Sequence, residues 1–127
     1  MTVAVAMNST PEGRAALLAG GAEAQFRGDD LVVLSVLDAD EVSPADRDSV
    51  ESQARELLGD TAFTTRVEPD GGDEAGAIVD LAAEVGATLV VIGSKRRSAV
   101  GKFLMGSTVQ RVLLDCPVPV LVVKAEH

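Results

Sequence analysis

The chain contains few of the residues that most catalytic sites require. Its 127 residues include no tryptophan, no tyrosine, one cysteine (Cys116) and one histidine (His127), which is the last residue. A Ser-His-Asp or Cys-His pairing is therefore not expected, nor is a zinc site built from Cys and His ligands. A lone cysteine also excludes a disulfide within the chain. We expect no catalytic residue and no metal ligand in this protein.

Long apolar segments are missing as well. The apolar runs at 87–92 and 118–123 are far shorter than the roughly 20 residues that cross a bilayer. The chain does not open with a basic segment followed by an apolar one. Its length suits one domain with a single core, over residues 1–127. We expect a cytoplasmic protein without a membrane partner.

Positive charge is scarce in the whole chain but concentrated in one part. The net charge of −9 argues against binding to nucleic acid, yet residues 85–114 contain no Asp or Glu. Within residues 93–108, GSKRRSAVGKFLMGST, three glycines accompany the cationic side chains Lys95, Arg96, Arg97 and Lys102. A glycine-rich loop between a strand and a helix binds phosphates through its backbone N–H groups. This segment therefore predicts an anion site, although a solvated surface loop would have a similar composition.

Alternating apolar segments and helix-start signals predict an α/β fold. Thr10-Pro11 and Ser43-Pro44 each combine an N-cap residue with proline at the first helical position, and Ser107 with Gln110 fits a capping box. Strands are expected at residues 2–7, 31–37, 61–68, 87–92 and 118–124, with a helix after each of the first four. Parallel strands are joined by right-handed crossovers. The sequence therefore predicts an open five-stranded parallel sheet, doubly wound with four helices, with the Thr-rich third strand at an edge.

With these elements placed, residues 2–124 resemble the universal stress protein family throughout. Nucleotide-binding members of that family carry a C-terminal pattern of Gly, two residues, Gly, nine residues, then Gly and Ser or Thr. Here the pattern falls on Gly93, Arg96, Gly106 and Ser107, so that three of its four positions match and Arg96 replaces a glycine. The arginine either supplies a phosphate contact or fills the groove that a glycine would leave open.

A second family signature is an apolar first strand that ends in Asp, followed by a small residue, Ser or Thr, and an Ala-Leu helix. Asn8, Ser9, Thr10 and Ala16-Leu17 are similar to it. Asn8 lacks the charge of Asp but still donates and accepts hydrogen bonds, so it is either a nucleoside contact or an ordinary turn residue. The resemblance implies a Rossmann-like sheet with strand order 3-2-1-4-5. That order places the ends of strands one and four side by side, at the switch point where such sheets bind ligands.

The resemblance implies an adenine nucleotide as ligand, with ATP as the leading candidate and Mg²⁺ bound through its phosphates. In relatives that bind nucleotide the end of strand two meets adenine, which implies that Val36 and Ile92 flank the base here. Lys95 and Arg97 would neutralise phosphates, and Ser107 is also explained by helix capping alone. The residues expected to contact the nucleotide are Ala6, Met7, Asn8, Val36, Ile92, Gly93, Arg96, Arg97, Gly106, Ser107 and Thr108.

The resemblance also implies a sensor or regulatory module of the stress response, acting on protein partners that the sequence does not name. Strand 118–124, with Pro117 and Pro119, belongs at a sheet edge, and relatives dimerise there, so a homodimer is expected. Any ATP hydrolysis is expected to be slow and incidental. The alternatives are a nucleotide-free protein-interaction or stress-survival module of the same fold and, with less support, a phosphoryl-accepting receiver-like domain. The latter needs paired acidic residues where this chain has Asn8 and Ser9.

Overall fold

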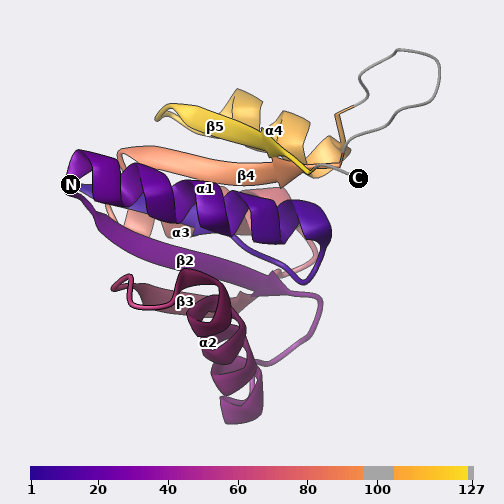
Figure 1. Ribbon diagram of the computed structural model, residues 1–127. Coiled ribbons are helices and arrows are strands. Elements are labelled where there is room, and N and C mark those ends of the chain that lie inside the picture. Colours follow the sequence, from indigo (N-terminus) through magenta and orange to yellow (C-terminus); the bar gives the residue numbers. More distant parts are fainter. Residues whose placement is uncertain (96–104, 126–127) are drawn as a thin grey trace.

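The computed structural model describes residues 1–95 and 105–125, in which strands alternate with helices along the chain (Figure 1). The strands are β1 (Thr2–Ala6), β2 (Asp30–Leu37), β3 (Thr64–Pro69), β4 (Leu89–Ser94) and β5 (Val120–Lys124). The helices are α1 (Pro11–Arg27), α2 (Pro44–Leu58), α3 (Glu74–Glu84) and α4 (Ser107–Asp115). No helix in this part of the chain has the length and apolar character of a membrane span.

All the strands belong to one parallel sheet, in the order β3-β2-β1-β4-β5. This is the order that the family resemblance implied, and it puts β3 and β5 at the edges as predicted. The central strand is β1, whose Val5 is in register with Val33 of β2 and with Val91 of β4. The chain therefore leaves β1 toward β2 on one side, while β4 pairs with it on the other. The carboxyl ends of β1 and β4 lie side by side at the switch point of the sheet.

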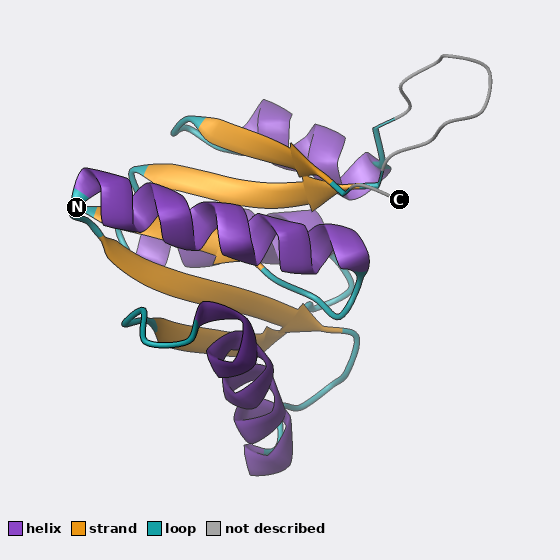
Figure 2. Cartoon of the chain, viewed as in Figure 1, coloured by secondary structure: helices purple, strands orange, loops and turns teal. Residues whose placement is uncertain are grey.

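Helices cover both faces of the sheet. Helices α1 and α2 lie in front of it and α3 and α4 behind it (Figures 1 and 2). Successive side chains of a strand point to opposite faces, so Val3 and Val5 of β1 pack in the core with α1 and α2, whereas Ala4 packs with α3 and α4. These three side chains are fully buried. Because helices cover both faces of the sheet, the central strands are continuous apolar segments in the sequence.

The predicted starts of the first two helices are confirmed. The side chain of Thr10 accepts a hydrogen bond from the backbone N–H of Gly13, and Pro11 is the first residue of α1. Ser43 and Asp46 form a capping box at the start of α2, each accepting from the backbone N–H of the other. At α3, Asp73 caps the helix by accepting from the N–H of Gly76 at 3.1 Å.

The predicted capping box of the last helix is wrong. The N-cap of α4 is Gly106, and no side chain caps this helix. Ser107 is already the first helical residue, so its hydroxyl lies one position too late to accept from the N–H groups that an N-cap residue serves. Gln110, the proposed partner, instead donates from Nε2 to the carbonyl of Met105 at 2.8 Å.

Strands β3 and β5 begin later than the sequence predicted. Strand β3 begins at Thr64 rather than residue 61, because the N–H of Thr61 is still bonded to the carbonyl of Leu58 in the turn after α2. Strand β5 begins at Val120, after both prolines. Proline has no N–H to donate to a ladder, although the Pro119 carbonyl still accepts from Val90 at 3.0 Å. The prolines therefore set where β5 joins the sheet.

Candidate functional site

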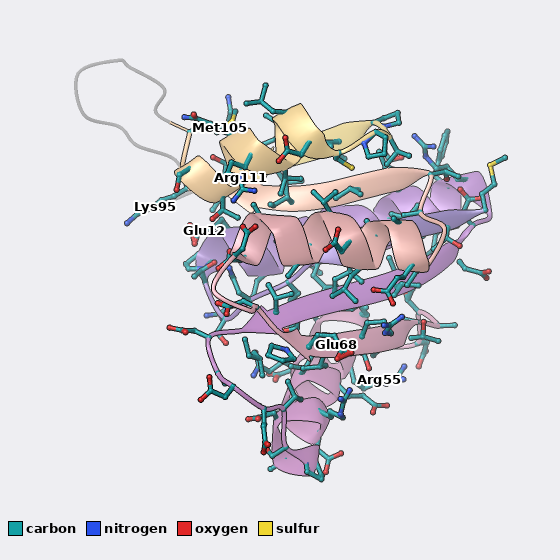
Figure 3. All side chains as sticks on the ribbon, turned by 180° about the vertical axis from the view of Figure 1, so that it is seen from behind. Glu12, Arg55, Glu68, Lys95, Met105 and Arg111 are labelled. Atoms are coloured by element: carbon teal, nitrogen blue, oxygen red, sulfur yellow. The ribbon has the colours of Figure 1, made fainter. Side chains whose placement is uncertain are left out.

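A cavity of about 210 Å³ lies at the carboxyl end of the sheet. Its walls come from the end of β1 and the start of α1, from β2, from the start of α3, from the end of β4 and from the start of α4. Glu12 and Lys95, which both line the cavity, lie close together at this end of the molecule (Figure 3). The cavity therefore occupies the switch point at which parallel α/β sheets bind their ligands.

The structure brings most of the predicted contact residues together in this cavity. Ser107 is exposed and does not line it, and Arg96 and Arg97 lie outside the described residues, as does Lys102. Lys95 does line the cavity. The predicted contacts found on its walls are Ala6, Met7, Asn8, Val36, Ile92, Gly93, Gly106 and Thr108.

One part of the cavity is apolar. Leu34 and Val36 come from β2, Ile92 from β4 and Ile78 from α3. These residues belong to the core that α3 and α4 form with the sheet, where Leu34, Ile78 and Ile92 are buried and Val36 is half-buried. A nucleobase loses little hydration free energy when its flat aromatic ring moves from water into apolar surroundings of this kind.

Another part of the cavity is suited to an anion. Ser94 ends β4 and is 1% exposed, and its hydroxyl has no hydrogen-bond partner among the described residues. It projects to the same face of the sheet as Ile92, which is the face that α4 covers. The first residue of α4 to donate its N–H within the helix is Gln110, to the carbonyl of Gly106 at 3.0 Å. Uncapped N–H groups, the positive end of the helix and a buried hydroxyl therefore meet at one place.

The two pattern glycines that the structure describes are needed for different reasons. A Cβ on Gly93 would collide with the backbone carbonyl of Glu12, so glycine lets the end of β4 approach the start of α1. A Cβ on Gly106 would meet no atom within 4 Å, and Gly106 has φ −64°, which any residue adopts. Packing accounts for Gly93 but not for Gly106.

Asn8 acts as a turn residue and also lines the cavity. Its side-chain oxygen accepts hydrogen bonds from the backbone N–H of Thr10 at 3.2 Å and from the Thr10 hydroxyl. This contact fixes the chain between β1 and α1 and holds Thr10 in its capping position. The two interpretations of Asn8 that the sequence left open are therefore compatible in geometry, because the turn uses only the carboxamide oxygen.

Two acidic residues on the cavity wall were not among the predicted contacts. Glu12 lies in the first turn of α1 and Glu74 in the first turn of α3. The loss of part of its hydration on the cavity wall raises the pKa of Glu74, and the negative charge of Asp70 raises it further. Acidic residues at helix starts are common because they complement the helix dipole, so nothing in the sequence indicated that these two converge on one cavity.

Arg111 belongs to the cationic part of the sequence but is engaged in an ion pair. It donates from Nη1 to Oδ1 of Asp73 at 2.5 Å and from Nη2 to Oδ2 at 3.4 Å, and it also pairs with Asp115 at 3.6 Å. The hydrogen bonds from Arg111, and then that from the Gly76 N–H, lower the pKa of Asp73, and the same contact raises the pKa of Arg111. This pair connects the N-cap of α3 to α4, and Figure 3 shows Arg111 at the same end of the molecule as Glu12 and Lys95.

The acidic residues of the cavity do not form a metal site by themselves. In residues 1–95 and 105–125, no three His, Cys, Asp or Glu side chains are arranged as metal ligands. Mg²⁺ prefers near-octahedral oxygen coordination and is often held largely by substrate phosphates. The donors on these walls therefore fit Mg²⁺ only as a companion of a bound phosphate group.

Comparison with known proteins identifies the family. The model of the universal stress protein family matches residues 1–124. A universal stress protein of Mycolicibacterium smegmatis is 34% identical over 125 residues, covering 96% of each chain. A solved universal stress protein from Archaeoglobus fulgidus is 27% identical, with a TM-score of 0.78 over 98% of both chains. A second structure from that organism, a complex with dAMP, is 24% identical, with a TM-score of 0.72 over 98% of both chains. The chain belongs to the universal stress protein family.

Proposed function

We propose that the protein binds an adenine nucleotide in this cavity and acts as a cytoplasmic sensor or regulatory module of the stress response. The base would lie against Val36, Ile78 and Ile92, and a phosphate would lie between Ser94 and the N-terminus of α4. The dAMP complex of the Archaeoglobus relative supports the choice of adenine. ATP, with Mg²⁺ held through its phosphates, is the form that we expect to be bound in the cell.

The buried hydroxyl of Ser94, which has no partner in the part of the chain that the structure describes, is the observation that carries this proposal. A buried hydroxyl without a partner costs free energy, and proteins rarely leave one unpaired. A phosphate oxygen would accept a hydrogen bond from it and from the N–H groups of the first turn of α4. Lys95, also on the cavity wall, would supply positive charge. Each of these groups favours an anion at the same place.

Titration calorimetry tests the proposal directly. The protein is stripped of nucleotide by unfolding and refolding, and ATP, ADP and AMP are titrated into it at one fixed salt concentration. We expect dissociation constants on the order of micromolar. In Ser94→Ala the lost hydrogen bond weakens binding by about tenfold, while the midpoint of chemical denaturation stays unchanged, because the hydroxyl has no hydrogen-bond partner to lose in residues 1–95 and 105–125.

Absence of binding would favour another function. If none of the three nucleotides gives heat or raises the melting temperature, the proposed function is wrong. The protein is then the nucleotide-free interaction module of the same fold, and the departures from the family pattern at Arg96 and Asn8 are signs of a decayed site. Equal affinity in the wild type and Ser94→Ala would instead show that the phosphate lies elsewhere.

We also propose that a second copy of this chain pairs with the β5 edge. Edge strands present unpaired backbone groups that invite association. Leu121 of β5 is 37% exposed and Leu114 of the adjoining α4 is 82% exposed, so the edge carries apolar side chains as well. Light scattering at micromolar protein concentration should give the mass of a dimer. A monomeric mass would contradict this proposal and leave nucleotide binding unaffected.

A further inference from the structure

Glu12 and Glu74 are the two acidic side chains that line the cavity. Within the described residues neither carboxylate has an ion pair or a hydrogen bond, although the structure satisfies other acidic groups nearby, such as Asp73 with Arg111. Glu74 is exposed and Glu12 is half-buried, so water hydrates both carboxylates until a ligand covers them, and a ligand that covers a carboxylate must replace that water with a hydrogen-bond donor. An unpaired carboxylate in a binding cavity therefore points to a ligand group that donates hydrogen bonds.

Glu74 adjoins the apolar part of the cavity. It is the first residue of α3, and Ile78 follows one helical turn later on the same face, so that both side chains line the cavity. Ile78 packs in the same core as Leu34 and Ile92. Glu12 instead lies in the first turn of α1, where its backbone carbonyl lies against Gly93 near the anion-binding part. Glu74 is therefore the acidic group placed to meet a base.

We propose that Glu74 accepts a hydrogen bond from the exocyclic amino group of the bound base and so selects a 6-aminopurine. This inference rests on the proposed function and adds a specificity-determining residue to it. A 6-amino group directs N–H donors at the carboxylate, whereas the 6-oxo group of hypoxanthine or guanine would direct an oxygen at it. A purine with hydrogen at this position would leave the carboxylate unpaired.

The environment of Glu74 is consistent with this role. Loss of hydration and the nearby charge of Asp70 raise its pKa, so in the absence of ligand the ionised form is not stabilised by its surroundings. A site built to bond a ligand N–H discriminates strongly against an analogue that lacks it, because its own polar group is then left without a partner. Adenine selectivity would thus come from α3 as well as from the strand ends.

The test compares two nucleotides that differ only at position 6. The adenosine nucleotide and the purine riboside nucleotide with the same number of phosphates are each titrated into the stripped full-length protein. We expect the wild type to bind the adenosine nucleotide about tenfold more tightly. In Glu74→Ala the ratio of the two dissociation constants should fall close to one. Asp70→Asn removes the same charge beside Glu74 but outside the cavity, and it should keep the wild-type ratio.

Three results would overturn the inference. They are a wild-type ratio near one, a ratio that Glu74→Ala leaves unchanged, and guanine nucleotides that bind as tightly as adenine nucleotides. The ratio separates selectivity from a general gain in affinity, because removing a negative charge strengthens both anionic ligands alike. Should the wild type bind neither nucleotide, the proposed function is wrong and this inference falls with it. Circular dichroism of Glu74→Ala checks that α3 is retained.

Discussion

The starts of α1, α2 and α3 differ from the start of α4 in one respect. At the first three helices a side-chain oxygen of Thr10, Ser43 or Asp73 accepts a backbone N–H at 3.1 Å. At α4 the N-cap is Gly106, which has no side chain to offer. A capping oxygen occupies the place that a phosphate oxygen would take at the same N–H groups. Of the three helices whose starts border the cavity, α1 and α3 are capped by a side chain and α4 is not, so the difference teaches that the first turn of α4 is the one left available to a phosphate oxygen.

Giving α4 the cap that it lacks should have the largest effect. In Gly106→Asp the new carboxylate can accept from the first turn of α4, and it would repel a phosphate at that place. We expect nucleotide affinity to fall at least about 100-fold in titration calorimetry, while the free energy of unfolding stays equal or rises by a few tenths of a kcal/mol, roughly the benefit of a capping side chain over glycine. Unchanged nucleotide affinity in this variant would show that the uncapped start of α4 does not bind the phosphate.

Alanine at the two pattern glycines provides the matched control. Gly106→Ala adds a Cβ that meets no atom of the described residues within 4 Å, so it should change the affinity by no more than a small factor and the free energy of unfolding by less than about 1 kcal/mol. Gly93→Ala places a Cβ against the carbonyl of Glu12 and should destabilise the protein by about 2 kcal/mol in chemical denaturation, as overpacking does. Equal stabilities of the two variants would show that this comparison of the glycines is wrong.

A smaller effect is expected at Asp73, which both caps α3 and pairs with Arg111. Asn caps helices about as well as Asp, so Asp73→Asn removes the ion pair and keeps the cap. The folded pKa of Asp73 lies below its ordinary value of 3.8. The pair therefore stabilises the wild type above that value, and the contribution is lost as the pH falls through the folded pKa.

The pH dependence of unfolding measures this contribution. Denaturation of both proteins between about pH 6 and pH 3 should show a wild-type advantage that shrinks toward acid pH. Because both side chains of the pair are half exposed, the advantage should be modest. An advantage that is constant with pH would mean that Asn is simply a poorer cap at this position.

Much of the fold could be predicted because its signals are local. Thr10-Pro11 and Ser43-Pro44 mark helix starts through the chemistry of neighbouring residues, and the apolar segments of β2 and β4 mark buried strands. The strand order came from the family resemblance, since the spacing of strands along a chain does not say which strands pair. Most predicted contacts line one cavity for the same reason, because they lie at strand ends that this order brings together.

What the sequence could not predict depends on contacts between distant segments. Arg111 pairs with a carboxylate 38 positions earlier in the chain, which the absence of Asp and Glu from residues 85–114 does not reveal. Whether Ser107 caps α4 depends on which residue first becomes helical, and the backbone of Gly106 decides this. The convergence of Glu12 and Glu74 follows from the positions of α1 and α3 on opposite faces of the sheet. No short pattern of residues encodes any of these.

The short length of α4 has a consequence for how the protein would respond to nucleotide. Nine residues are too few to form a stable helix in isolation, and two buried valines, Val109 and Val112, fasten this helix to the sheet. A phosphate at its N-terminus would act as the missing cap, so the free energy of binding would also be free energy of helix formation. The nucleotide concentration would then set the fraction of molecules in which α4 is formed and exposes Leu114 beside the β5 edge. The bound ligand would thus help to stabilise the surface that a partner protein contacts.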